Sequence, residues 1–518
     1  MKIVRTILFT LVVVFFFSGC DNKKKQSTLP NIILILGDDI GYSDIGPYGS
    51  EISTPSLDRL ATEGIRFSRF YNMSKCEPSR SSLFTGVYEG GKGSVNFLSV
   101  LKNAGYYIIH SGKEHWMKWA PESLYATNVS DQSLTFHAMN EFFEPPSGKF
   151  VNPFILNGKE VSADEIYHEK EPFFKTDALT DNALRWLDTP IERGQPFFLF
   201  LGYGAAHYPL QAREEDIEKY RGTYLKGWDS IRNERLKRLK KLGLMDESVK
   251  LSPPSSNINR FRGHPKGDKE RRTVIPLYRP WENLTDVEKN ELDLEMAVFA
   301  AMVDRMDQNI GRVLEKIEEA GLAENTLVIY LSDNGSCPYD SNRDFIYPPG
   351  DARGFRCLSA AWANVGNTPF RYFKQYGQEG GAQTHFIARW PSVINPGSIT
   401  FQQGHIVDLA PTILEACGLA YPDSIQNRKT QPLMGKSLLP VFKGEEAAES
   451  PFYFSGWTDK FRMYRKGDWK IVKTNGEEWE LYNLKTDPTE ITNQADENPE
   501  VLQEMLESFK TDKELAGY

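Results

Sequence analysis

The stretch Asn31-Ile32-Ile33-Leu34-Ile35-Leu36-Gly37-Asp38-Asp39 decides the fold. Its apolar residues follow one another without alternation, which is typical of a strand buried on both faces in a parallel sheet. Two further runs, at 197–201 and 327–331, have the same character, and each also leads into polar residues. The sequence therefore predicts three buried strands that each end in a polar cluster.

Helices are predicted between these strands, and the clearest covers about 292–320. Its apolar side chains recur in alternating steps of three and four residues, the spacing of a helix face packed on a core: Leu292, Met296, Phe299, Val303, Met306, Ile310, Val313 and Ile317. Strands alternating with helices predict an α/β fold, with a large mixed or mostly parallel sheet between helices. Ligands of such folds bind at the carboxyl ends of the strands.

Length and composition fit a soluble two-part globular protein of 518 residues, with 40% hydrophobic and 25% charged residues. The net charge of -9 excludes a basic nucleic-acid-binding protein. We expect a catalytic domain over 31–440, with an insertion at about 208–290 that is highly charged and interrupted by prolines. Beyond 440, short aromatic segments between turn residues predict a small antiparallel sheet, followed by a helix at about 499–515 within a subdomain over 441–518.

The N-terminus has the order of a secretory signal at 1–19, with basic residues, an apolar run at 7–17 and then small residues. The apolar run is too short to span a bilayer comfortably. Its ending, Phe17-Ser18-Gly19-Cys20, resembles a bacterial lipobox, in which the cysteine is lipidated. We therefore expect an exported, membrane-anchored lipoprotein, facing the periplasm or on the cell surface, with a tether at 20–30. A plain signal peptide cut near Cys20 is the alternative.

The run Cys76-Glu77-Pro78-Ser79-Arg80-Ser81-Ser82-Leu83-Phe84-Thr85-Gly86 carries the strongest indication of chemistry. Proline suits the first turn of a helix, so Cys76 is placed at a helix start. Backbone N–H groups at a helix start favour an anion. Arg80 lies one turn further along and can contact the same anion. The alternative is a buried structural cysteine near a helix N-terminus.

This run resembles the signature of the sulfatases, a family of the alkaline phosphatase superfamily: cysteine-x-proline-serine-arginine, then x-x-leucine-x-threonine-glycine. The resemblance implies that Cys76 is oxidised to Cα-formylglycine by a formylglycine-generating maturation enzyme. The insertion and the segment before Lys374 look most like those of bacterial arylsulfatases. The loop between Gly86 and Asn96 is shorter than relatives commonly have, which leaves the substrate open.

Two oxygen-rich clusters match the family's metal site. Asp38 and Asp39 end the first strand, and Asp333 and Asn334 end the third. Carboxylate and amide oxygens suit a hard cation, Ca²⁺ or alternatively Mg²⁺, and the family usually holds Ca²⁺. The resemblance implies that position 76 also contacts the metal.

The resemblance also implies further sulfate contacts. Lys113 and His115 lie in a Gly-Lys-x-His element, with Lys113 on a sulfate oxygen and His115 on the formylglycine hydroxyl. His207, after the second strand, is expected near the leaving oxygen as general acid, assisted by Lys374. Arg80, Lys113 and Lys374 would stabilise the transferring sulfuryl group. His385 is only a candidate pocket residue, because relatives often have proline at its position.

We therefore expect a sulfuric ester hydrolase whose substrate is a sulfated small molecule or carbohydrate. On a carbohydrate chain we expect exo action, at the terminal sugar. Two alternatives stay open. One is a formylglycine-dependent hydrolase of phosphonate or phosphate esters, and the other is a non-catalytic, membrane-tethered glycan-binding protein. Among the remaining cysteines, Cys337 and Cys357 are a candidate disulfide that sequence alone does not establish.

Overall fold

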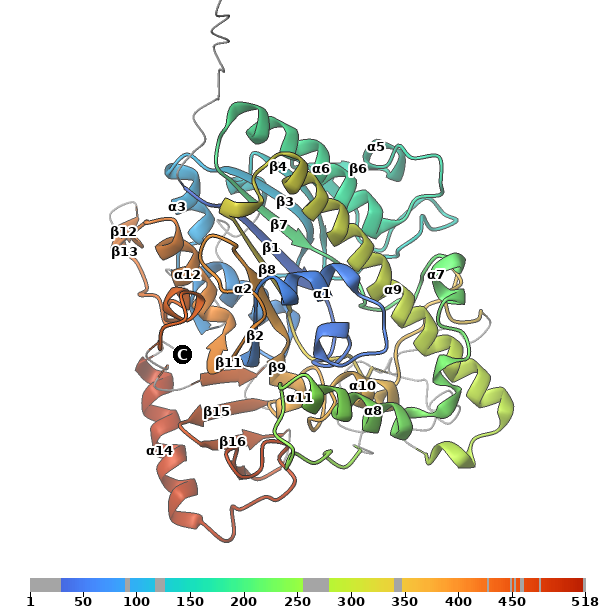
Figure 1. Cartoon of the computed structure of the whole chain (residues 1–518), viewed down its shortest axis with the longest axis vertical. Helices are drawn as coiled ribbons and strands as arrows, with labels where there is room; N and C mark the ends of the chain where they lie inside the picture. Colours follow the sequence, from blue (N-terminus) through green and yellow to red (C-terminus); the bar gives the residue numbers. More distant parts are fainter. Residues whose placement is uncertain are drawn as a thin grey trace, which may run out of the picture.

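The three predicted strands are neighbours at the centre of the sheet in the computed structural model of the chain (Figure 1). They are β7 (Phe197–Gly202), β1 (Asn31–Gly37) and β8 (Thr326–Ser332). β1 pairs in parallel with both others, and every residue of the three strands is buried. Their carboxyl ends therefore lie at one edge, as predicted.

The structure describes residues 29–88, 94–116, 126–254, 279–339, 347–425, 428–447, 450, 453–456, 461–474 and 477–515. The predicted signal, the lipidation of Cys20 and most of the tether lie outside these residues and stay predictions. None of the helices in these ranges combines the length and the apolar character that a bilayer crossing requires.

Within the described residues the large sheet has eleven strands, parallel at its centre and mixed toward its edges. β9 (Gln383–Thr384) pairs with β2 beside the main order. The main order is β11 (Ser398–His405), β2 (Ile65–Tyr71), β10 (Phe386–Arg389), β8, β1, β7, β3 (Tyr107–Glu114), β4 (Gln132–His137), β5 (Phe154–Leu156) and β6 (Lys159–Val161).

Helices cover both faces of this sheet, because alternate side chains of β1 point into two different cores. Ile33 and Ile35 pack in one core and Ile32, Leu34 and Leu36 in the other. The first core is closed by α1 (Pro55–Thr62), α6 (Lys175–Arg193) and α9 (Asp286–Glu319). The second is closed by α2 (Cys76–Thr85), α3 (Phe97–Asn103), α12 (Leu409–Ala416) and α13 (Leu439–Phe442). The predicted α/β sandwich is confirmed.

The long predicted helix is α9, which begins at Asp286 and so starts earlier than the apolar pattern. Thr285 and Glu288 form a capping box there, which satisfies the first backbone N–H groups. The first turns of α9 carry mostly polar side chains, so hydrophobic periodicity alone could not locate this start.

The predicted insertion contains α7 (Glu214–Glu218), η4 (Thr223–Lys226) and α8 (Trp228–Lys241), and η6 (Trp281–Asn283) precedes α9. α7 and η4 contact α9, and α8 contacts α10 (Ala360–Gly366). Trp228 of α8 is buried, with its ring edge-on to Trp362 of α10 at 5.6 Å between centroids. This segment is therefore part of the core packing.

The C-terminal part confirms the predicted antiparallel sheet and final helix. The order is β14 (Tyr453–Gly456), β15 (Arg462–Lys466), β16 (Trp469–Lys473) and β17 (Glu480–Asn483), with α14 (Pro499–Leu515) against β15 and β16. The candidate disulfide is not formed in this structure. Cys337 and Cys357 are both free, buried thiols.

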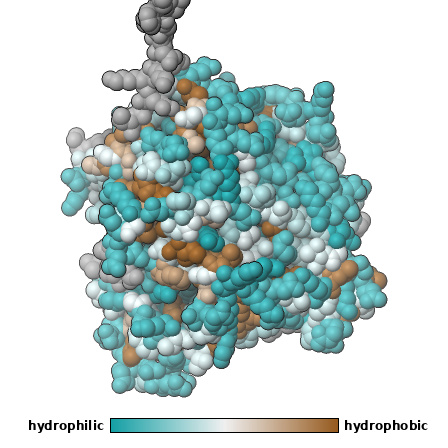
Figure 2. All heavy atoms as spheres, viewed as in Figure 1, coloured by the Kyte–Doolittle hydropathy of each residue, from teal (hydrophilic) through white to brown (hydrophobic). Residues whose placement is uncertain are grey.

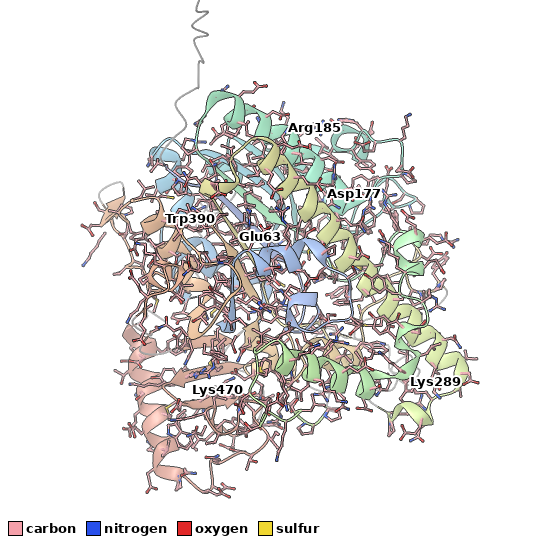
Figure 3. The ribbon with its side chains drawn as sticks, in the orientation of Figure 1. Glu63, Asp177, Arg185, Lys289, Trp390 and Lys470 are labelled. Carbon is pink, nitrogen blue, oxygen red and sulfur yellow. The ribbon has the colours of Figure 1, made fainter. Side chains whose placement is uncertain are left out.

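A buried ion cluster joins the C-terminal sheet to the catalytic domain. Lys470 of β16, labelled in Figure 3, lies 2.8 Å from Glu490 Oε1 and also contacts the Glu379 carboxylate. Glu379 begins α11 (Glu379–Ala382), and its carboxylate accepts a hydrogen bond from the Tyr71 hydroxyl of β2 at 2.9 Å. All of these side chains are at most 1% exposed. One lysine therefore holds two carboxylates from different parts of the chain.

We predict that Lys470→Met destabilises the protein by about 3–5 kcal/mol, because two buried carboxylates lose their cation. The midpoint of thermal unfolding measures this loss. The matched control is Lys466→Met on the neighbouring strand. Lys466 is 47% exposed and lies 3.7 Å from Asp512, so its loss should cost less than about 1 kcal/mol. Equal midpoints for the two variants would contradict the prediction.

Candidate functional site

Four oxygen-bearing side chains meet at the carboxyl ends of β1 and β8, as the sequence predicted. Asp38 and Asp39 follow β1, and Asp333 and Asn334 follow β8; all four are at most 1% exposed. The Asp38 N–H donates to the Ala205 carbonyl beyond β7 at 2.9 Å, and the Asp39 N–H faces Asp333 Oδ1 at 3.4 Å. Backbone N–H groups of the aspartate pair thus join the three strand ends, through a carbonyl beyond β7 and a carboxylate after β8.

Asp39 has a φ of 64°, a left-handed conformation that is uncommon for a residue other than glycine. The turn places Asp39 Oδ1 within 2.8 Å of the Asn334 amide nitrogen. Strain of this kind persists only where the surroundings hold it. Here the hydrogen bonds of the strand ends supply that constraint.

Three buried oxygens of this cluster accept no hydrogen bond from any residue that the structure describes: Asp38 Oδ1, Asp39 Oδ2 and Asn334 Oδ1. Buried oxygens without a donor are costly, so they call for a partner that contributes positive charge. Ligand atoms of Asp38, Asp39 and His207 lie within 4.8 Å of one another, and so do those of Asp38, Cys76 and Asp333. The residues present therefore fit a divalent cation.

Cys76 is the first residue of α2, in the extended-to-helical transition that the sequence predicted, and is 1% exposed. Its sulfur belongs to the same close group as Asp38 and Asp333. The helix N-terminus adds partial positive charge at this position. An oxygen placed on the side chain of residue 76 would therefore lie beside both the carboxylates and the helix end.

Three buried cations surround the carboxylates. Arg80 Nε donates to Asp333 Oδ2 at 2.9 Å, and its Nη1 donates to the Lys113 carbonyl at 3.1 Å. Lys113 Nζ lies 2.6 Å from Asp38 Oδ2, and Lys374 Nζ contacts Asp39 Oδ1. All three are at most 1% exposed. Their positive charge is therefore concentrated on the acidic edge of the sheet.

These cations divide the carboxyl pKa values. Burial opposes the charge of Asp38, but the cations Lys113, Arg80 and Lys374 outweigh it and hold the pKa of Asp38 well below its usual range. The pKa of Asp39 is lowered in the same way, because the charge of Lys374 outweighs the effect of burial. Burial and the neighbouring Asp38 instead raise the pKa of Asp333 well above its usual range. Asp333 thus binds a proton more readily than Asp38 and Asp39 do.

His207 follows β7 and is 7% exposed. Its Nδ1 lies 2.7 Å from the Tyr208 carbonyl, which can only accept, so Nδ1 carries the proton and Nε2 has the lone pair. Nε2 lies 3.6 Å from Asp39 Oδ2. Burial lowers the pKa of His207 to about 3, so the imidazole is neutral. Nε2 is the ring atom that can exchange a proton inside the site.

His115 adjoins the cluster through a residue that the sequence reasoning passed over. Its Nε2 lies 3.2 Å from the carboxylate of Glu77, the variable position of the cysteine motif. Its Nδ1 is buried and has no hydrogen-bond partner among the described residues, and the ring packs edge-on against His137 at 5.3 Å. Burial lowers the pKa of His115 to about 4. The only available signal was a carboxylate next to the cysteine.

His385 belongs to the core. It is fully buried, its Nδ1 lies 3.2 Å from the Gly41 carbonyl, and its ring stacks on Tyr330 at 5.2 Å. Burial lowers its pKa to about 3. This is the environment of a packing residue, and we assign His385 no contact with substrate.

Arg235 supports the site from the predicted insertion. This fully buried arginine of α8 lies 2.6 Å from Asp44 Oδ1 and 2.7 Å from Glu51 Oε1. Asp44 in turn accepts the Gly41 N–H at 2.9 Å, two residues after Asp39. The insertion therefore holds the loop that carries the aspartate pair. Sequence reasoning missed this link, because nothing local pairs a helix arginine with a loop almost 200 positions away.

Comparison with known proteins gives a consistent picture. The family model described as Sulfatase matches residues 30–419, and the model for the N-sulphoglucosamine sulphohydrolase C-terminal region matches residues 370–514. An uncharacterized sulfatase of Schizosaccharomyces pombe is 31% identical, covering 94% of each chain. An arylsulfatase of Klebsiella aerogenes is 30% identical, covering 80% of this chain and 92% of its own.

An N-acetylglucosamine-6-O-sulfatase of Bacteroides thetaiotaomicron is 25% identical, covering 94% of this chain and 86% of its own. Among solved structures, Ps i-CgsB in complex with k-i-k-neocarrahexaose superposes with a TM-score of 0.64 at 23% identity. That match covers 93% of this chain and 92% of the other. The structural match supports the fold assignment.

We predict that a divalent cation stabilises the folded chain through the Asp38–Asp39 cluster. Ca²⁺ or Mg²⁺ at about 100 times its Kd should add about 2.7 kcal/mol of stability, seen as a higher unfolding midpoint than in chelator. Asp39→Ala should abolish this difference, whereas Asp188→Ala on the surface should keep it. A cation-dependent midpoint that survives in Asp39→Ala would show that the ion binds elsewhere.

Proposed function

The chain belongs to the sulfatase family, and we propose that this sulfatase removes sulfate from the ends of sulfated carbohydrates with an oxidised side chain at position 76. The observation that carries the proposal is the location of the Cys76 sulfur. It lies in one close group with carboxylate oxygens of Asp38 and Asp333, at the N-terminus of α2. A nucleophile made there would meet the cations of the site directly.

The proposed modification is Cα-formylglycine, formed on Cys76 by a formylglycine-generating maturation enzyme. In its hydrated form this aldehyde supplies one hydroxyl that attacks sulfur and a second that allows sulfate release. An unmodified cysteine has no second oxygen and so lacks that release route. His115, held by Glu77 at 3.2 Å, is the residue that we assign to the second hydroxyl, with Nδ1 as the acceptor.

The proposed metal is Ca²⁺, with Mg²⁺ as the alternative, held by Asp38, Asp39, Asp333 and Asn334. Carboxylate and amide oxygens are the donors that such hard cations prefer. When bound, the metal supplies charge stabilisation for oxygens of the reacting group. The three buried oxygens without hydrogen bonds support this assignment.

Arg80, Lys113 and Lys374 are proposed to hold the equatorial oxygens of the sulfuryl group. Charge-assisted donors aimed at developing negative charge are the main source of such catalysis. Lys113 and Lys374 now contact Asp38 and Asp39 through flexible side chains, so both can turn toward an anion bound beside them. Lys374 is assigned as the donor to the leaving oxygen. His207 Nε2 lies beside the same carboxylate, Asp39, and donates a proton there only after it has accepted one.

The substrate class is proposed from two observations. One relative is an N-acetylglucosamine-6-O-sulfatase and another an N-acetylgalactosamine-6-sulfatase, both named for sulfated sugars. The reacting groups are also deeply buried, with Arg80, Lys113 and Lys374 at most 1% exposed. A terminal sugar reaches such a centre more readily than the middle of a polymer does, which favours exo action.

Cys76→Ala should release no sulfate above the uncatalysed rate while keeping the wild-type unfolding midpoint. The control is Cys417→Ala, which removes another buried thiol, next to Tyr106, and should keep turnover. Mass spectrometry of the peptide that contains position 76 should find an aldehyde in place of CH₂SH. Active enzyme that carries only the thiol would overturn the assignment of the nucleophile.

Substrate class is tested by sulfate release from defined sulfated oligosaccharides. We expect release from the terminal sugar and, after its removal by a glycosidase, from the newly exposed one. Aryl sulfate and aryl phosphate esters are compared in parallel, with sulfate expected to react faster. Release only from internal positions would refute exo action, and faster phosphate cleavage would favour the phosphoester hydrolase.

A further inference from the structure

A groove of about 780 Å³ lies where three parts of the chain meet, separate from the buried carboxylate cluster. One side is the edge of the large sheet, with Ser68 and Arg69 of β2 and Phe401 of β11. The second side is the segment that follows α8, and the third is the C-terminal loop after β17. The second side consists of residues 244–246 and 248–250, and the third of residues 484–489 and 491–492. Phe370 and Gln383 complete the lining.

The groove has apolar side chains at its surface. Phe401 is 53% exposed and Ile491 is 44% exposed. The described residues contain only five large hydrophobic side chains of such exposure, and these two line the same groove. Figure 2 shows an apolar area on the face seen there, over the region where Figure 1 places β9 and β11. Clustered exposed apolar groups with polar surroundings are typical of a binding surface.

Three cations line the same groove: Arg69, Lys250 and Lys485. None of them forms an ion pair with any other residue in the described ranges. The two acids of the lining accept hydrogen bonds from backbone N–H groups close to them in the sequence. Asp246 accepts from the Ser248 N–H at 2.8 Å, and Asp487 accepts from the Thr492 N–H at 2.9 Å. The three cations and two acids leave the lining with a net charge of +1, on a chain whose net charge is -9.

From this combination we infer that the groove is a second binding site, which takes a strand of sulfated polysaccharide. Sulfate groups would contact the three cations, and the apolar faces of sugar rings would pack against Phe401 and Ile491. An uncharged glycan would leave the cations without partners, and a flexible anionic peptide would leave the rigid apolar surface unused. Neither matches the lining as well as a sulfated glycan does.

This inference rests on the proposed carbohydrate substrate and extends it to polymer capture. A strand held in the groove keeps its sulfated ends near the enzyme, which raises their effective concentration at the catalytic centre. The groove should therefore affect kcat/KM on polymeric substrates and leave small aryl sulfates unaffected. Phe370 lines the groove and precedes Lys374 by four residues, so one segment serves both places.

The test uses the full chain with Lys250→Ala, Lys485→Ala and Phe401→Ala combined. The matched control combines Lys149→Ala, Lys159→Ala and Val151→Ala, which removes two lysines and one exposed apolar side chain from another surface. Binding is measured in the Cys76→Ala background, to exclude turnover, with dextran sulfate, unsulfated dextran and poly-L-glutamate. Turnover of an aryl sulfate is measured with Cys76 intact.

We expect the groove variant to bind dextran sulfate about tenfold more weakly than the control, with unchanged aryl sulfate turnover. Unchanged dextran sulfate affinity would overturn the inference. So would equal binding of unsulfated dextran, or a parallel loss of poly-L-glutamate binding, which would indicate a general polyanion or protein site. Absence of sulfate release by the unmutated chain would instead refute the proposed function, and the binding result would still decide on the groove.

Discussion

The structure depends on keeping three carboxylates together in the interior. Asp38, Asp39 and Asp333 are at most 1% exposed, and isolated buried charges of this kind are among the most costly groups in a protein. Arg80, Lys113 and Lys374 supply an equal formal positive charge at hydrogen-bonding distance. A divalent cation and a sulfate monoester add charges of opposite sign, so each offsets part of the charge that the other brings.

The scaffold maintains this arrangement from several directions, and two of them come from segments outside the central sheet. Arg235 of α8 holds Asp44 and Glu51 in the loop after Asp39, while Lys470 of β16 holds Glu379, five residues after Lys374. Breaking a buried ion pair costs more than the pair contributes, because an unpaired charge remains. The insertion and the C-terminal subdomain are therefore structural parts of the site.

The sequence could predict features that depend on neighbouring residues, but not those that depend on contacts between positions far apart in the chain. The strand ends and the first turn of α2 depend on local patterns, so the meeting of Asp38, Asp39, Asp333 and Cys76 could be predicted from the sequence. Their roles stay predictions. The ion pair between Arg235 and Asp44 joins positions far apart in the sequence, so no local pattern encodes it. His385 likewise looked like a pocket residue by its place in a motif, and only the stacking on Tyr330 shows its packing role.

The burial of the centre also bears on how this sulfatase selects its substrate. In the proposed mechanism the buried Arg80, Lys113 and Lys374 contact the sulfuryl group and the oxygen that leaves with the alcohol, which every sulfate ester presents alike. Interactions that are equal for all substrates cannot discriminate among them, since specificity is a difference between affinities. Discrimination must then come from less enclosed residues near the cluster. Tyr208 is one of them: its ring lies 4.1 Å from that of His207 and 5.7 Å from that of Phe355, and both Tyr208 and Phe355 are partly exposed. Tyr208 and Phe355 are therefore candidates for contact with the part of the substrate that lies beyond its sulfate.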